Sequence, residues 1–179
     1  METESSNKEP IKIIILGLDN CGKTSISLLL QRKNTLSYFS SLSPTRGYDT
    51  QFFKDKNTNS EFVIWDLGGQ EQHRDDHLKN LLSEYMAGTN KLIFVIDIQD
   101  IERYDLALDY LNKVIRELKS GNIRVKLSIF LHKFDSDLGL NEESISGLKM
   151  KIKGIISKEF EYNIYKTSIY AVFRKTLTT

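Results

Sequence analysis

The sequence predicts an α/β fold, doubly wound, with a mostly parallel six-stranded sheet and one antiparallel hairpin strand. Two observations indicate this class. Continuous apolar runs of strand length alternate with segments whose apolar residues recur at helical spacing, and one pair of neighbouring strand-like runs is separated only by a short polar turn. A chain of 179 residues, 40% hydrophobic and 27% charged, suits one domain. We place this domain over residues 11–179, after a disordered polar tail over residues 1–10.

Composition excludes several functional classes. The formal net charge of +1 gives no broad cationic surface for nucleic acid. The single cysteine, Cys21, cannot form an internal disulfide and fits a reducing compartment. Neither a signal peptide nor a membrane-spanning apolar run is present, and Glu2 stands where N-myristoylation requires glycine. We therefore expect a cytoplasmic protein with no direct lipid anchor, for which any recruitment to membranes would run through a partner.

The first strand and the loop after it organise the chain. Residues 11–16 (IKIIIL) form a β-branched run suited to a strand covered on both faces. Residues 17–24 (GLDNCGKT) then fit the phosphate-binding pattern GxxxxGK[ST]. In that pattern Lys23 can reach terminal phosphates and Thr24 can offer a hydroxyl to Mg²⁺. A bare pattern is also compatible with a glycine turn that binds nothing, but its place between a strand and a helix favours nucleotide binding.

The next elements lead to a second motif. The first helix is expected to end near Arg32, and the Ser/Thr-rich stretch 34–47 predicts a surface loop. Residues 48–56 and 61–66 predict two strands joined by a turn over 57–60.

The second of these strands runs into residues 65–70 (WDLGGQ). A carboxylate at this strand end can hold Mg²⁺ through water, a glycine N–H can meet a γ-phosphate, and a glutamine can orient an attacking water. The alternative is a strand end followed by a flexible turn. A highly charged helix is expected to start at Glu71 and to end near Gly88.

The second half of the chain repeats the strand and helix alternation. Three further strands are predicted over residues 91–97, 125–131 and 161–166. Two helices are predicted, over residues 101–118 and around residues 145–156. The strand over 125–131 leads into residues 132–135 (HKFD), at a carboxyl end where ligands of open α/β sheets collect. Four lysines on the last helix favour a solvated face over a docking site for an acidic membrane or partner (Lys149, Lys151, Lys153, Lys158).

With these motifs in this order, the chain resembles the small GTPases of the Ras superfamily over almost its full length. GLDNCGKT, WDLGGQ and residues 44–47 (PTRG) are similar to the Arf branch. HKFD and residues 167–170 (TSIY) are similar to the Rag branch. The sequence leaves the branch open between the two.

The resemblance implies a magnesium site and a phosphate site. Thr24 and Thr45 would give hydroxyls to Mg²⁺, with Asp66 behind one of its waters. Lys23 would neutralise the β- and γ-phosphates, and Gln70 would position the attacking water, which makes these two the expected catalytic residues. The glycine before it, at position 69, would sense the γ-phosphate through its N–H.

The resemblance also implies guanine as the base. Asp135 would accept from the N1–H and 2-amino groups, which adenine cannot offer. Lys133 would lie along the base, and the backbone of Ser168 and Ile169 would meet the base carbonyl. His132 stands where most of the superfamily has asparagine, and an imidazole cannot reproduce the paired donor and acceptor of an amide. The expected nucleotide-binding set is Asp19, Asn20, Cys21, Gly22, Lys23, Thr24, Ser25, Thr45, Gly69, His132, Lys133, Asp135, Ser168 and Ile169.

Three details of the motifs carry separate expectations. The negative charge of Asp19 near phosphates is tolerable if its side chain turns outward, and Cys21 is better explained as a small loop residue than as a redox switch. His73, Arg74 and His77 indicate neither a metal site nor a built-in arginine finger.

The leading functional hypothesis is a molecular switch that hydrolyses GTP to GDP and phosphate, slowly without an activating partner. Loops over about 34–47 and 67–79 would differ between the two states and be read by partners, among them an exchange factor, an activating protein and an effector. The alternative is a Rag-like, nucleotide-locked interaction subunit with little turnover, dimerising through a missing C-terminal region or a separate subunit. A P-loop kinase or ATPase is disfavoured by Asp135 and by the lack of an acceptor-site lid.

Overall fold

The computed structural model describes residues 10–32, 42–55, 60–135, 142–156 and 158–170. Within these residues one six-stranded sheet has the order β2-β3-β1-β4-β5-β6. Its strands are β1 (Ile11–Gly17), β2 (Tyr48–Lys54), β3 (Glu61–Leu67), β4 (Thr89–Asp97), β5 (Lys126–His132) and β6 (Tyr162–Lys166). Only the β2–β3 pair is antiparallel among the described strands. The predicted doubly wound, mixed α/β fold is confirmed.

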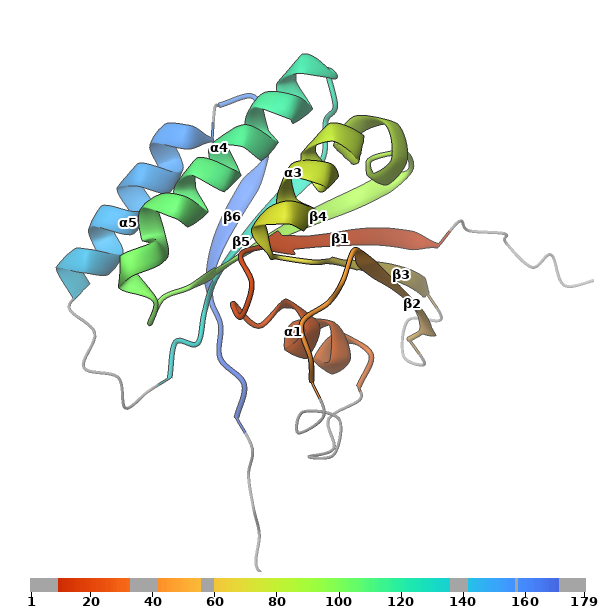
Figure 1. Cartoon of the computed structure of the whole chain (residues 1–179), viewed down its shortest axis with the longest axis horizontal. Helices are drawn as coiled ribbons and strands as arrows, with labels where there is room; N and C mark the ends of the chain where they lie inside the picture. The colour runs from red at the N-terminus through yellow and green to blue at the C-terminus, as the bar shows by residue number, and fades with distance from the viewer. Residues whose placement is uncertain (1–9, 33–41, 56–59, 136–141, 157, 171–179) are drawn as a thin grey trace, which may run out of the picture.

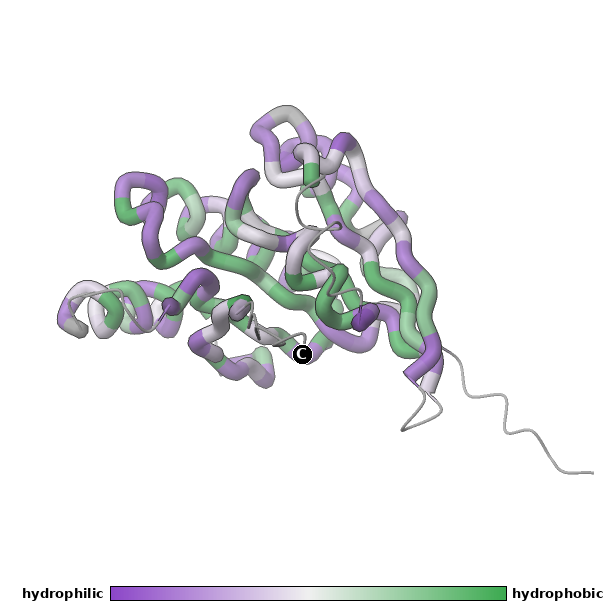
Figure 2. The backbone as a smooth tube through the Cα atoms, turned by 90° about the horizontal axis from the view of Figure 1, so that it is seen from below, coloured by the Kyte–Doolittle hydropathy of each residue, from purple (hydrophilic) through white to green (hydrophobic). Residues whose placement is uncertain are grey.

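The helices form one layer on each face of this sheet. They are α1 (Lys23–Leu30), α3 (Glu71–Asn80), a π-helix η1 (Leu81–Tyr85), a 3₁₀ turn η2 (Ile101–Arg103), α4 (Tyr104–Ser120) and α5 (Glu142–Ile155). Helices α3, α4 and α5 lie on one face of the sheet, and α1 lies on the other (Figure 1). The strands run through the apolar middle of the molecule, with hydrophilic segments mostly around its rim (Figure 2). No helix in the described part of the chain is long and apolar enough to span a membrane.

Alternation along the strands divides the core in two. Successive side chains of a strand point to opposite faces, so Ile14 and Leu16 of β1 join the larger cluster under α3, α4 and α5. Ile13 and Ile15 join the smaller cluster beside α1. All four are buried, as expected for a strand covered on both faces.

Several predicted boundaries differ from the structure for local physical reasons. Helix α1 ends at Leu30 instead of near Arg32, because Arg32 adopts a left-handed backbone with φ 60°. Strand β2 ends at Lys54 instead of at residue 56. The tail expected over residues 1–10 lies outside the described residues except for Pro10, as do residues 34–41 of the predicted loop and residues 57–59 of the predicted turn.

The helix expected from Glu71 to Gly88 is interrupted. After α3 the chain widens into η1, closed by a bond of 3.0 Å from the Met86 N–H to the Leu81 carbonyl. This wider turn places the Tyr85 ring edge-on to Trp65, with 5.8 Å between ring centroids. The helix expected from residue 101 likewise starts as the 3₁₀ turn η2 and becomes α-helical only at Tyr104.

Candidate functional site

The candidate site lies where the loops after β1, β3 and β5 meet. In the loop after β1, Asn20 and Gly22 have φ of 59° and 95°. Two reasons require glycine at position 22: its positive φ disfavours any other residue, and a Cβ would lie 2.6 Å from Cδ2 of His132. The β5 end therefore packs directly against the β1 loop.

A cavity of about 390 Å³ opens beside this loop, within the usual size range of ligand pockets. It is lined by Asp19, Asn20, Gly22, Lys23, Thr24, Ser25, Leu42, Ser43, Pro44, Thr45, Gly69, Gln70 and Lys133. Most of the predicted site residues therefore share one cavity wall. The remaining ones do not line it: Cys21, Asp66, His132, Asp135, Ser168 and Ile169.

Lys23 carries the positive charge of the cavity. It is the first residue of α1 and only 6% exposed, which is rare for lysine without a partner. Its Nζ donates to the Leu18 carbonyl at 2.8 Å. An ammonium group has three donors, so two remain for an anion in the cavity.

Thr24, Thr45 and Asp66 meet at one point although they come from three segments. The Thr24 hydroxyl donates to Asp66 Oδ2 at 2.6 Å, and Thr45 Oγ1 lies 3.2 Å from Thr24 Oγ1 and 3.4 Å from Asp66 Oδ2. Burial raises the pKa of Asp66 above its usual range, against the hydrogen bond from Thr24 and the charge of Lys23. Its other oxygen, Oδ1, is buried without a hydrogen-bond partner among the described residues.

These groups fit a magnesium ion. Two hydroxyl oxygens and a carboxylate are the hard oxygen ligands that Mg²⁺ takes, and a buried carboxylate oxygen without a partner is costly unless something satisfies it. No cluster of three or more His, Cys, Asp or Glu side chains suited to a metal occurs in the part of the chain that the structure describes.

The segment after β3 packs tightly on the β1 loop. The Asp19 N–H donates to the Gly69 carbonyl at 3.0 Å, and a Cβ on Gly69 would lie 2.3 Å from the Asp19 nitrogen. No side chain can be added at position 69 without displacing the β1 loop. Gln70 follows as an exposed residue at the start of α3 and lines the cavity.

Lys133 connects the β5 end to the cavity. Its Nζ forms an ion pair of 2.6 Å with Asp97 and donates to the Asn20 carbonyl at 2.9 Å. Its backbone adopts φ 60°, a conformation uncommon for a residue with a side chain. His132, just before it, lies with Nδ1 3.0 Å from the Thr167 hydroxyl. Burial lowers the pKa of His132, so its imidazole is neutral at pH 7.

Asp135 follows Lys133 by two residues, and both oxygens of its carboxylate accept hydrogen bonds. Gln99 Nε2 donates to Oδ2 at 3.0 Å, and the Ser168 hydroxyl donates to Oδ1. The same Gln99 amide donates to the Lys133 carbonyl at 2.9 Å. Ile169 is half-buried next to Ser168.

The sequence motifs do not include three residues of the site: Asp97, Gln99 and Arg103. Asp97 is the last residue of β4, and Gln99 and Arg103 follow it in the chain. Arg103 forms an ion pair of 3.0 Å with Asp19. The signal that could have found them is their place at the carboxyl end of a central parallel strand. The residue pattern there, DIQDIER, matches none of the nucleotide-binding motifs.

Two side chains of the β1 loop differ in their surroundings. Asp19 turns to Arg103, and the Cys21 thiol is buried, which raises its pKa and makes it a poor nucleophile. Arg74 is 7% exposed and donates to the Gly69 carbonyl at 2.7 Å. Its guanidinium therefore stabilises the segment after β3.

Comparisons with known proteins point to one family. The family model described as "ADP-ribosylation factor family" matches residues 1–177. ADP-ribosylation factor-like protein 4A of Homo sapiens is 33% identical over 133 residues, which cover 73% of this chain and 62% of the relative; the Mus musculus protein gives the same values. The chain thus spans less than two thirds of the length of these relatives.

Solved structures resemble the chain in fold. The Arl6 BBS3 small GTPase from Trypanosoma brucei, with bound nucleotide analogue GppNp, aligns with a TM-score of 0.67 at 21% identity, covering 89% of this chain and 87% of that one. The bacterial selenocysteine-specific elongation factor EF-Sec aligns with a TM-score of 0.62 at 20% identity, covering 90% of this chain and 26% of that one.

Proposed function

Because the chain belongs to the ADP-ribosylation factor family, the Arf branch of the Ras-superfamily small GTPases, we propose that it is a GTP-binding switch that hydrolyses GTP to GDP and phosphate. The observation that carries the proposal is the meeting of Thr24, Thr45 and Asp66 beside the buried ammonium of Lys23. A triphosphate with Mg²⁺ needs this combination of hard oxygen ligands and a fixed positive charge.

We assign the phosphates to the β1 loop. The left-handed backbone at Asn20 and Gly22 is typical of loops whose successive N–H groups surround an anion. Helix α1 starts at Lys23 and adds the positive end of its dipole. The two remaining donors of the Lys23 ammonium would bind the terminal phosphates, which neutralises charge that develops during transfer.

Thr24, Thr45 and Asp66 are the residues that would hold Mg²⁺, the two threonines directly and Asp66 through water. When bound, the ion neutralises the β- and γ-phosphate oxygens. Thr45 belongs to the loop expected over 34–47, so its hydroxyl links that loop to the nucleotide state.

Gln70 is the proposed water-positioning residue. It is exposed, lines the cavity and follows Gly69, so its amide can accept from and donate to a water beside a γ-phosphate. Gly69 would meet that phosphate through its N–H. Arg74 is not proposed as an arginine finger, because its guanidinium donates to the Gly69 carbonyl.

Asp135 is the proposed reader of the base. With guanine bound, its carboxylate would accept from the N1–H and 2-amino groups, and the bond from Gln99 to Oδ2 would keep it oriented. Lys133 would lie along the base, and the Ser168 and Ile169 backbone would meet the base carbonyl. Neutral His132 would join the β1 loop to Thr167 in place of an asparagine.

The proposed output is a change of partner. Hydrolysis would end the γ-phosphate contact of Gly69 and the Mg²⁺ contact of Thr45, so the segments around 42–47 and 67–79 would be free to take a second arrangement. An exchange factor, an activating protein and an effector would read the two states in the cytoplasm, and a partner would supply recruitment to membranes. The alternative is a nucleotide-locked interaction subunit that hydrolyses little GTP. The Rag-like motifs HKFD and TSIY favour this alternative.

Two measurements test the proposal. Mass spectrometry of the nucleotide carried through purification should find GDP or GTP, and ATP instead would contradict the assignment of Asp135. Single-turnover hydrolysis of GTP by the purified protein should then yield GDP and phosphate. Bound GTP that persists unhydrolysed, even with an activating protein, would favour the nucleotide-locked subunit.

A further inference from the structure

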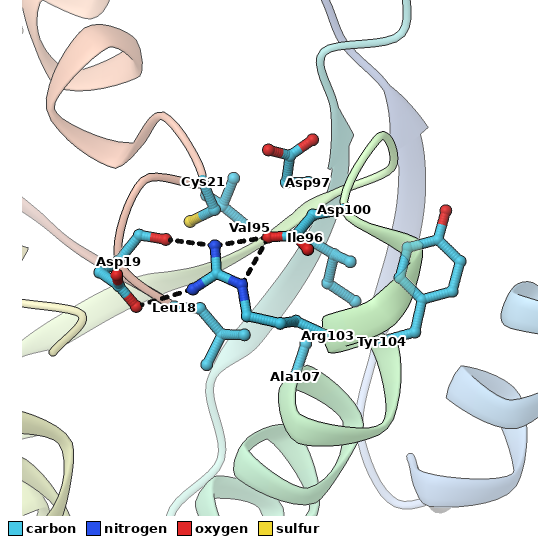
Figure 3. A pocket seen from close by; sticks show the side chains of 10 residues that line it. All are labelled: Leu18, Asp19, Cys21, Val95, Ile96, Asp97, Asp100, Arg103, Tyr104 and Ala107. Atoms are coloured by element: carbon cyan, nitrogen blue, oxygen red, sulfur yellow. Dashed lines mark hydrogen bonds and ion pairs between the residues drawn. The ribbon is translucent and has the colours of Figure 1, made fainter. Parts of the chain in front are cut away.

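Arg103, at the end of η2, reaches across to the β1 loop (Figure 3). Its Nη1 donates to Asp19 Oδ1 at 3.0 Å, and its Nη2 lies 3.4 Å from the Asp19 carbonyl oxygen. Its Nε donates to Asp100 Oδ2 at 2.5 Å. One guanidinium thus contacts the side chain and the backbone of Asp19, and its Nε and Nη2 are both bound by the Asp100 carboxylate.

The contact matters because Asp19 is an acid in a loop proposed to bind phosphates. A carboxylate this close to a triphosphate repels it unless a cation neutralises the charge. Arg103 places a cation 3.0 Å from the Asp19 carboxylate. Its planar fork also holds Asp100, so its one positive charge offsets Asp19 while being shared with the second carboxylate. The hydrogen bond to Asp100 raises the pKa of Arg103 further, so the guanidinium stays charged at neutral pH.

The backbone contact has a second effect. Every peptide bond of the described residues is trans, so a carbonyl and the N–H that follows it point in opposite directions. Arg103 holds the Asp19 carbonyl and Lys133 holds the Asn20 carbonyl at 2.9 Å. The N–H groups of Asn20 and Cys21 are therefore turned away from these two cations, as an anion-binding loop requires.

We propose that Arg103 is a positioning residue of the phosphate loop, which offsets the charge of Asp19 and fixes the peptide after it so that the loop can accept nucleotide phosphates. The inference rests on the proposed function and adds a group that makes no contact with the nucleotide itself. It assigns a nucleotide-related role to the β4–α4 connection, in which none of the nucleotide-binding motifs occurs.

A purely structural role predicts different behaviour. The side chains of Arg103 and Asp19 are 32% and 44% exposed, and ion pairs that open to solvent contribute little to folding stability. Removing Arg103 should therefore leave the fold intact and act on the ligand through charge. The effect should be larger for GTP than for GDP, because GTP carries more negative charge, and it should shrink as salt screens the repulsion.

The test measures dissociation constants of GDP and of a non-hydrolysable GTP analogue, with Mg²⁺, at low and high ionic strength. For Arg103→Gln we expect GTP-analogue binding to weaken by about tenfold and GDP binding by about threefold. Adding Asp19→Asn to that variant should recover most of the loss, since the repelling charge is gone. Arg32→Gln is the matched control, because Arg32 also forms an ion pair, of 2.8 Å with Asp55, away from the cavity.

Each outcome decides the inference. Unchanged binding by Arg103→Gln, or equal losses for the two nucleotides that Asp19→Asn does not recover, would overturn it while leaving the proposed function in place. Absence of guanine-nucleotide binding by the unaltered protein would overturn both. If Arg103→Gln does not fold, Asp19→Asn alone still decides, because it should bind the GTP analogue two- to threefold more tightly; weaker binding would contradict the inference.

Discussion

Asp66 is buried with one oxygen bound by threonine and the other without a partner among the described residues. Burial penalises its charged form, which is why its pKa is raised. A buried carboxylate of this kind weakens the fold at neutral pH unless a cation compensates it. We interpret Asp66 as a residue that serves Mg²⁺ binding and that lowers the folding stability when no Mg²⁺ is bound.

Asp66→Asn tests this interpretation. Because the folded-state pKa of Asp66 is raised, its penalty is absent below its unfolded pKa of about 3.9 and is complete once the pH has risen above the folded value. In the absence of Mg²⁺ and nucleotide, the variant should therefore be more stable than the unaltered protein at pH 7, by about 1 kcal/mol or more, and equally stable near pH 3. Urea unfolding at the two pH values measures this difference. A variant that is less stable at pH 7 would contradict it.

Gln70→Leu tests the water-positioning role. The substitution removes the amide but leaves Lys23, Thr24 and the β1 loop in place, so GTP binding should persist while single-turnover hydrolysis slows by an order of magnitude or more. Lys23→Ala is the comparison, because it should weaken binding itself. Hydrolysis by Gln70→Leu at the parent rate would assign the water to another group.

Helix α3 and the π-helix after it carry a buried histidine. His77 is 3% exposed, and its ring meets Tyr85 edge-on with centroids 5.5 Å apart. Desolvation, together with the nearby charge of His73, lowers its pKa from 6.5 to about 4, although Asp76 acts in the opposite direction. Because His77 is buried in its neutral form, acid should weaken the packing of this helix. The helix belongs to the segment that is proposed to change with the nucleotide.

The sign of the effect follows from the lowered pKa. The stabilisation from neutral His77 is fully present above its unfolded pKa of 6.5. Below that pH the unfolded state takes up a proton that the folded state does not, so stability is lost until the pH reaches the folded value of about 4. We expect the unaltered protein to lose about 2–3 kcal/mol from this group between pH 7 and pH 4. In His77→Phe this contribution is absent. Between pH 7 and pH 4 the free energy of unfolding of the variant, measured by chemical unfolding, should therefore fall correspondingly less. Identical pH profiles would show that His77 does not titrate with unfolding.

The sequence predicted elements better than their ends. Continuous apolar runs identified the buried strands, because a strand covered on both faces is apolar at nearly every position. The π-helix at Leu81–Tyr85 was missed, since it depends on where Tyr85 must lie against Trp65, a tertiary contact that periodicity does not contain. The left-handed end of α1 at Arg32 was missed for a similar reason, because no glycine marks it.

Across the whole molecule, the sequence predicted which motifs meet but not how they are held together. The motifs were predicted at the carboxyl ends of strands, and the family resemblance implied that Thr24 and Asp66 share one magnesium site; in the structure these two residues are in direct contact. It did not predict Gln99 and Arg103, which orient Asp135 and Asp19 from the β4 end. Such supporting residues act through side chains already in the site, so they match no ligand-binding pattern of their own.

The same molecule-wide arrangement explains why one structure can couple a base to a phosphate site. Lys133 bonds at once to Asp97 at the β4 end and to Asn20 in the β1 loop. His132 packs its ring on Gly22. A base bound at Asp135 would therefore fix the phosphate loop as well.

Guanine specificity is tested by competitive binding of GTP, ATP and XTP, with Mg²⁺, to the unaltered protein and to Asp135→Asn. The unaltered protein should prefer GTP over ATP by at least about a hundredfold, since adenine lacks the donors that Asp135 accepts and the carboxylate would be left unpaired. Asp135→Asn should move the preference toward XTP, whose 2-oxo group accepts where guanine donates. Equal binding of ATP and GTP by the unaltered protein would contradict the proposed guanine-nucleotide switch.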